Sequence, residues 1–386
     1  MHERVICVMA RMLDQDDGLG VYARNLLERL LPLDRGTRYL ILLRTAKHAD
    51  AFKRHPNAET RVVPARFKTW WDQVAVLREA ERAGADLIFN PKFSVPLLAR
   101  CPVVFVLQGS DWYVNPQNYE WWDNLYIRAT LPLYCRKAER LLAISRTVVD
   151  DLERPLRLDR ARISVSYAGP SPHFTSSRDE QALARFRAEH ALPDRFILTV
   201  ARTYHTGHGR QPSYPGGNNE RLLRGYRRYA DAGGRLPLVV VGHDIERYLR
   251  ERGFDDRSLA GVRFTGYIPH DRIHMAYQLA ELFVLATLNE SFCFPLVEAF
   301  ATGCPAIVPR TGACPEIAGD AARLIDPFDE ADIAAAIAEL AGSAGRRAAL
   351  AAAGRERAKL FRWDETARRT LAVFDELVPR RGALAA

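Results

Sequence analysis

The feature that most constrains the fold is a regular alternation of short apolar runs with longer helix-like stretches. Such runs are typical of buried parallel strands, with the intervening helices covering the faces of the sheet. The chain therefore reads as two successive Rossmann-like α/β units, one in each half. The strand-like runs are Val5–Met9, Tyr39–Leu43, Leu87–Phe89, Val103–Leu107 and Leu141–Ile144 in the first half, and Phe196–Val200, Leu238–Val241, Val262–Phe264, Leu282–Ala286, Ala306–Val308 and Arg323–Ile325 in the second.

A segment rich in glycine and proline separates the two series of runs. Residues 167–174 include Gly169, Pro170 and Pro172, and residues of this kind typically interrupt regular structure. We therefore expect one domain over residues 1–173 and a second over residues 174–363, with a ligand site in the cleft between them.

Composition narrows the class of protein. No apolar stretch among the 386 residues approaches the roughly 20 that a membrane helix needs, and the amino-terminal run lacks the length and cleavage site of a signal peptide. We expect a cytoplasmic protein.

The six cysteines show no C-x-x-C spacing, so buried free thiols are expected. The chain has no G-x-x-x-x-G-K-[ST] motif, and neither ATP hydrolysis nor nucleic-acid binding is expected.

The formal charge of +8 includes a basic cluster beside an apolar, aromatic stretch. Arg128, Arg136, Lys137 and Arg140 flank residues 131–134, which read Leu-Pro-Leu-Tyr. This composition is compatible with peripheral contact with an anionic inner membrane, or with an acceptor that carries a phosphate. The alternative is a solvated helix face without a partner.

The segment after the run Leu282–Ala286 carries the strongest functional signal. Glu290 follows the end of that run, and Pro295 favours the start of a helix that Gly303 ends, which places Glu298 one turn inside the helix. Ligands of open α/β sheets bind beyond the carboxyl ends of the strands, and helix amino termini attract phosphate. Carboxylates accept hydrogen bonds from sugar hydroxyls, so this pattern points to a phosphorylated sugar.

The same segment resembles the E-x7-E signature of the family 4 retaining glycosyltransferases. That family has the GT-B fold, with two Rossmann-like domains facing each other across a cleft. Ser291 and Cys293 stand where glycines are usual in the family. The alternative is that the two acids are unrelated. Glu298 would then complement the helix dipole, and Glu290 would be a solvated loop residue. The residues that match the family are Glu290, Phe292, Pro295, Glu298 and Ala299, and the likeness continues over residues 303–308, 312–317 and 326–327.

The resemblance implies a donor site for a nucleotide diphosphate sugar. In it Glu290 binds the donor sugar, Glu298 binds the ribose hydroxyls, and backbone amides of the loop hold the phosphates together with Arg202. The closing helix, residues 364–386, is expected to pack back on the N-terminal, acceptor-binding domain. The implied donor-site residues are Gly18, Gly20, Arg202, Arg210, Glu290, Ser291, Phe292, Cys293, Phe294, Pro295 and Glu298.

Several of these positions depart from the family or rest on weak motifs. Gly18 and Gly20 follow the first strand and open a helix, which suits the approach of a ligand to the backbone. The family lysine has no clear counterpart, since Gly217 or Asn218 occupies its place, and Arg210 is the candidate substitute. The alternative for Arg210 is a surface loop with no catalytic part.

The resemblance also addresses catalysis. Relatives have His-Asp after the strand that corresponds to Val103–Leu107, whereas this chain has Gln108 and, three positions later, Asp111, which is retained as a catalytic candidate beside Glu290 and Arg202. Asp14-Gln15-Asp16 resembles the D-x-D metal motif of the other glycosyltransferase fold. GT-B relatives generally need no metal, so neither a metal nor a further cofactor is expected.

The resemblance therefore implies a metal-independent hexosyltransferase of cell-surface polysaccharide or lipopolysaccharide assembly. The donor is expected to be GDP-mannose or a UDP-sugar, and the acceptor a hydroxyl of a glycan or of a lipid-linked glycan. Two alternatives remain open. One is a GT-B sugar-nucleotide epimerase or hydrolase, and the other is a non-catalytic nucleotide-sugar-binding subunit.

Overall fold

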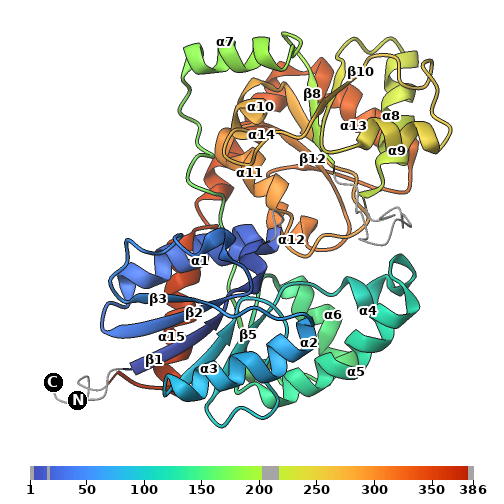
Figure 1. Ribbon diagram of the computed structural model, residues 1–386. Coiled ribbons are helices and arrows are strands. Elements are labelled where there is room, and N and C mark those ends of the chain that lie inside the picture. The colour runs from blue at the N-terminus through green and yellow to red at the C-terminus, as the bar shows by residue number, and fades with distance from the viewer. Residues whose placement is uncertain (1–3, 15–17, 202–216, 381–386) are drawn as a thin grey trace. The chain divides into compact units, whose positions relative to one another are not determined.

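The computed structural model describes residues 4–14, 18–201 and 217–380. The chain divides into two compact units, Met1–Ala168 together with Arg362–Ala386, and Gly169–Phe361 (Figure 1). The sequence placed the boundaries at 173/174 and 363/364, whereas the units of the structure meet at 168/169 and 361/362.

The first unit is built on a seven-stranded parallel sheet in the order β3-β2-β1-β4-β5-β6-β7. Its strands are β1 (Arg4–Met9), β2 (Thr37–Leu43), β3 (Ala58–Val62), β4 (Leu87–Asn90), β5 (Val103–Leu107), β6 (Arg140–Ala143) and β7 (Ile163–Val165). Its helices are α1 (Gly18–Leu33), α2 (Lys68–Trp70), α3 (Val76–Arg82), α4 (Asp111–Val114), α5 (Trp121–Lys137), α6 (Arg146–Leu156) and α15 (Trp363–Leu377).

Two strands of this sheet, β3 and β7, have no counterpart among the runs predicted from the sequence. Both are edge strands, and their residues are half-buried or exposed, whereas β1 and β5 are buried throughout. A strand that is not buried on both faces needs no continuous apolar run, so the periodicity of β3 and β7 is weak.

Helix α15 completes the first unit although it lies at the other end of the chain (Figure 1). The ring of Trp363 packs edge-on against Tyr22 of α1 with 5.4 Å between centroids, and Phe374 packs against Phe89 of β4 at 5.1 Å. Arg4 of β1 binds Asp375 at 2.6 Å. Apolar burial and an ion pair thus hold α15 to the sheet and to α1.

The second unit is built on a six-stranded parallel sheet in the order β10-β9-β8-β11-β12-β13. Its strands are β8 (Ile197–Val200), β9 (Leu238–Val241), β10 (Val262–Gly266), β11 (Leu282–Val284), β12 (Ala306–Pro309) and β13 (Arg323–Ile325). Its helices are α7 (Glu180–Glu189), α8 (Asn219–Asp231), α9 (Ile245–Glu251), α10 (His274–Leu279), α11 (Phe294–Thr302), α12 (Cys314–Ala318), α13 (Glu330–Gly342) and α14 (Ala344–Ala358). Each of these strands overlaps a predicted run.

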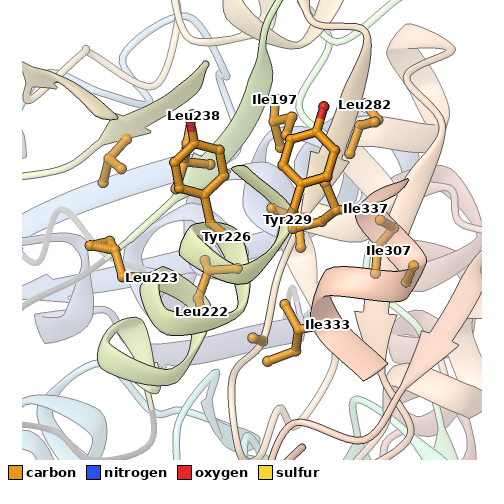
Figure 2. Packing of buried hydrophobic residues seen from close by; sticks show 14 of the residues in the cluster. Ile197, Leu222, Leu223, Tyr226, Tyr229, Leu238, Leu282, Ile307, Ile333 and Ile337 are labelled. Carbon is orange, nitrogen blue, oxygen red and sulfur yellow. The ribbon is translucent and has the colours of Figure 1, made fainter. Parts of the chain in front are cut away.

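The core of the second unit lies between its sheet and the helices α8 and α13. Figure 2 shows Tyr226 and Tyr229 of α8 among apolar residues of the sheet and of α13, including Ile197 and Ile333. The hydroxyl of Tyr226 donates to the carbonyl of Gly261 at 2.9 Å, which satisfies its buried polar group. This core fixes the sheet whose strand ends carry the candidate site.

The described residues contain no helix that is long and apolar enough to cross a membrane. All six cysteines are free thiols, and all except Cys101 are buried, as the sequence predicted.

Candidate functional site

The loop between β11 and α11 carries both glutamates of the E-x7-E pattern. Strand β11 ends at Val284 and α11 begins at Phe294, with Pro295 in its first turn. Gly303 ends the helix in the left-handed region, at a φ of 78°, which glycine adopts without a steric cost. The predicted strand, loop and helix are thus confirmed, and Glu298 lies one turn inside α11.

Cys293 reproduces the backbone conformation that a glycine would favour at its position. Its φ and ψ are 66° and 58°, in the left-handed region, and it directly precedes α11. A residue with a side chain costs about 1 kcal/mol there. Burial raises the pKa of its thiol, and Cys314 lies within hydrogen-bonding reach. Cys293 therefore has the left-handed conformation that a glycine would adopt without this cost.

Gly312, in the β12–α12 loop, fixes the position of Glu290. Its φ is 56°, and a Cβ atom there would lie 2.5 Å from Oδ1 of Asn289 and 2.7 Å from both the nitrogen and the oxygen of Glu290. The amide of Ala313 donates to the carbonyl of Glu290 at 2.7 Å. Only glycine permits this approach of two strand-end loops.

Glu298 is buried, and each of its carboxylate oxygens has a side-chain partner. Nε2 of His270 lies 3.0 Å from Oε1, and the hydroxyl of Tyr277 in α10 donates to Oε2 at 3.3 Å. Burial and the neighbouring Glu298 raise the pKa of Tyr277 well above its ordinary value, so the hydroxyl stays a donor. His270 and Tyr277 therefore orient the carboxylate, and the sequence predicted neither of them.

Two aromatic rings, those of His173 and Phe174, lie beside His270. The His173 ring lies 6.1 Å from the rings of both His270 and His274, and Phe174 lies 5.2 Å from His270. Burial, with His270 and His274 nearby, lowers the pKa of His173, so its neutral form is favoured. Each residue is unremarkable in the sequence, and no spacing connects residues 173–174 with residues 270–277.

The side chain of Asn218 links the backbone segments that follow β11 and β13. It lies at the start of α8 with a φ of 52°, and its Nδ2 donates to the carbonyls of Ala286 and Pro327 at 2.7 Å each. Asn218 is one of the two positions that could correspond to the family lysine. It is a buried side-chain amide that bonds to the backbone. The predicted phosphate ligands Arg202 and Arg210 lie outside the described residues.

In the first unit, Gly18 and Gly20 open α1, as predicted. Asp111 is the first residue of α4, and its carboxylate accepts hydrogen bonds from Asn115 at 2.7 Å and from Tyr119 at 2.9 Å. These local bonds give Asp111 a structural role, and its catalytic role stays a prediction. Gln108, in the place of the family histidine, donates to the carbonyl of Pro91 at 2.7 Å.

The basic and aromatic stretch around residues 131–134 does not form one surface. Leu131 and Tyr134 are buried on the inner side of α5, and Leu133 is exposed. Arg140 belongs to β6, where it donates to the carbonyl of Ala161. Half of its apolar residues therefore face the core, and contact with a membrane stays a prediction for the exposed side of the stretch alone.

Within the part of the chain that the structure describes, no group of three or more His, Cys, Asp or Glu side chains is arranged to hold a metal ion.

Comparison with known proteins agrees with this architecture. The Glycosyltransferase Family 4 model matches residues 17–172, and the model of Glycosyl transferases group 1 matches residues 218–357, which include the E-x7-E loop. A glycosyltransferase from Rickettsia africae ESF-5 has a TM-score of 0.75 at 12% identity and covers 98% of this chain and 99% of its own. Anabaena HepE in complex with UDP and glucose has a TM-score of 0.73 at 15% identity, covering 97% and 100%. The chain has the GT-B fold.

Curated relatives of this GT-B protein include two mannosyltransferases. The O-antigen chain mannosyltransferase B of Escherichia coli is 30% identical over 142 residues, 36% of each chain. The MMP alpha-(1->4)-mannosyltransferase of Mycolicibacterium hassiacum is 36% identical over 142 residues, 36% of this chain and 34% of its own. The chain thus matches about a third of the length of these relatives.

Proposed function

We propose that this GT-B protein is a retaining glycosyltransferase. It moves a hexosyl or deoxyhexosyl group from a nucleotide diphosphate sugar to a hydroxyl of a glycan or lipid-linked glycan in cell-surface polysaccharide assembly. The observation that carries the proposal is the buried Glu298 carboxylate, oriented by His270 and Tyr277 at the start of α11 and eight positions after Glu290.

The donor nucleotide would bind at this loop. The two oxygens of Glu298 accept the ribose hydroxyls, and because His270 and Tyr277 hold the carboxylate beforehand, little conformational freedom is lost on binding. The amino terminus of α11 favours the phosphates through its partial positive charge. Glu290, held against Gly312, accepts hydroxyls of the sugar.

The chemical step needs stabilisation of a departing diphosphate. Preorganised positive charge is often the largest contribution to such catalysis. We assign that charge to Arg202 and Arg210, with the leaving phosphate accepting the proton of the attacking hydroxyl on the same face of the sugar. Because no step uses a metal ion, transfer is expected to proceed in the presence of EDTA.

A mannosyl donor ranks first, since the names of the two relatives above are those of mannosyltransferases. The base is tested by thermal unfolding of the full chain with GDP, UDP, dTDP and CMP in turn. A nucleotide at about a hundred times its dissociation constant adds roughly 2.7 kcal/mol to folding stability. Glu298→Ala should abolish that shift, and the exposed Glu356→Ala should retain it.

Transfer itself is tested with GDP-mannose and UDP-glucose and a glycolipid acceptor, with the anomeric configuration of the product read by NMR. An α-linked product from an α-linked donor supports retention. Release of free nucleotide without an acceptor would assign the protein to the epimerases or hydrolases. Binding without turnover on any acceptor would assign it to the non-catalytic subunits, and absence of binding would contradict the donor site.

A further inference from the structure

Helix α5 presents large apolar side chains to solvent. Trp121 is 70% exposed and Leu125 is 61% exposed, and Trp122 and Leu133 are exposed at 52% and 44%. The inner side of the same helix buries Ile127, Leu131, Tyr134 and Cys135. A surface helix normally places polar residues opposite its buried stripe, so the outer side of α5 requires another explanation.

The exposed residues of α5 share one face. At about 100° per residue, Trp121, Trp122, Leu125 and Leu133 fall within an arc of about 120°. Arg128 and Arg136 fall within or beside the same arc, and both are exposed.

Helix α5 has one carboxylate among residues 121–137, all of which are described, and it is Asp123. Asp123 borders the face on the side of α2, where its charge favours the protonated form of Lys68. Since Arg128 and Arg136 outnumber this one carboxylate, the outer face of α5 is apolar with a net positive charge.

Helix α2 extends this face. Nζ of Lys68 lies 5.9 Å from the ring of Tyr126 in α5, which places the two helices side by side. Phe67 is 62% exposed, with the guanidinium of Arg66 over its ring at 5.3 Å, and Trp70 is also exposed. Figure 1 shows α2 and α5 beside each other. We call this surface the α2–α5 face, and its members are Arg66, Phe67, Lys68, Trp70, Trp121, Trp122, Leu125, Arg128, Leu133 and Arg136.

We propose that the α2–α5 face docks on the headgroup region of an anionic lipid bilayer. Tryptophan rings favour the boundary between headgroups and acyl chains, and arginine and lysine are attracted to anionic lipid. A second copy of the chain is a poorer occupant, because a twofold interface would bring the same positive face against itself. This inference goes beyond sugar transfer and does not depend on it.

The test is co-sedimentation of the full chain with vesicles of phosphatidylcholine alone and of phosphatidylcholine mixed with phosphatidylglycerol. The protein should bind the mixed vesicles, and added salt should weaken binding because it screens the arginines. The triple variant Trp121→Ser, Trp122→Ser, Leu125→Ser and the double variant Arg128→Gln, Arg136→Gln should each lower the partition coefficient at least about tenfold.

The matched controls are Phe328→Ser and Leu360→Ser, which remove equally exposed apolar side chains from the second unit. Both should bind vesicles like the unchanged protein. Since the substituted residues are exposed, all variants should keep its unfolding midpoint and any nucleotide-induced shift, which separates this test from that of the donor site.

Three results would overturn the proposal. The first is that the unchanged protein does not bind mixed vesicles, and the second is that the triple variant binds them equally well. The third is a concentration-dependent dimer in sedimentation velocity, lost in the triple variant and unaccompanied by vesicle binding, which would assign the face to a second copy.

Discussion

At the scale of single residues, the tightest steric constraint in the candidate site is the approach of Gly312 to Glu290. Gly312→Ala should lower the free energy of unfolding by about 3 kcal/mol, since a Cβ atom would add a clash to the strain of a positive φ. It should also weaken donor binding by displacing Glu290. Urea unfolding and calorimetric titration measure the two effects.

Gly233→Ala is the matched control for this prediction. Gly233 also has a positive φ, at 91°, but no atom lies within 4 Å of a Cβ placed there. The cost should therefore be about 1 kcal/mol from backbone strain alone. Equal losses in the two variants would mean that the contact with Glu290 does not constrain the loop.

The hydroxyl of Tyr277 should matter for nucleotide binding. Tyr277→Phe removes the donor to Oε2 of Glu298, and we expect affinity for the nucleotide to fall about three- to tenfold. Tyr226→Phe removes another buried hydroxyl of the same unit, one that bonds Gly261, and should cost stability without changing affinity. Calorimetric titration of both variants separates the roles. Equal nucleotide affinities in the two variants would show that the Tyr277 hydroxyl does not contribute to the site.

At the scale of elements, the carboxylate of Asp332 in α13 binds residues at both ends of β13. Burial alone would raise the pKa of this carboxyl, but the amide of Asp326 and the guanidinium groups of Arg323 and Arg310 outweigh it and hold the pKa below its ordinary value. The stabilisation is therefore present above the ordinary pKa of an aspartate and is lost as pH falls through the lower value reached in the folded protein.

Asp332→Asn should consequently lower the free energy of unfolding at neutral pH, and its difference from the unchanged protein should shrink as pH falls below about 4. Urea unfolding across this range measures the effect. The exposed Asp256→Asn serves as the control. A difference that stays constant with pH would show that the charge of Asp332 contributes nothing.

Elements were predictable from the sequence where their signals are local. The runs that became β5, β9 and β13 were located to the residue, because these short strands are apolar and closely bounded. Strands β3 and β7 were missed because edge strands need no buried run. Helix α11 was predictable because Pro295 and Gly303 mark its two ends.

At the scale of the whole molecule, the two units have separate cores and should unfold in separable steps. Phe374→Ala leaves a cavity beside Phe89 in the first unit and should destabilise that unit by about 3–5 kcal/mol. A bound nucleotide should raise chiefly the transition of the second unit, which carries Glu290 and Glu298. Scanning calorimetry measures both, and one transition that moves as a whole would contradict independent cores.

The sequence by itself determined the succession of strands, the position of Glu290 at a strand end and the position of Glu298 in a helix. These features depend on apolar periodicity and backbone preference within a few residues. Only the tertiary structure decided which side chains hold Glu298, since His270 and Tyr277 precede it by 28 and 21 residues. It also decided the packing of α15 beside β1 and β4, and the outer face of α5. The physical reason is that a parallel sheet joins residues distant in the chain, and their contacts leave no periodic signal in the sequence.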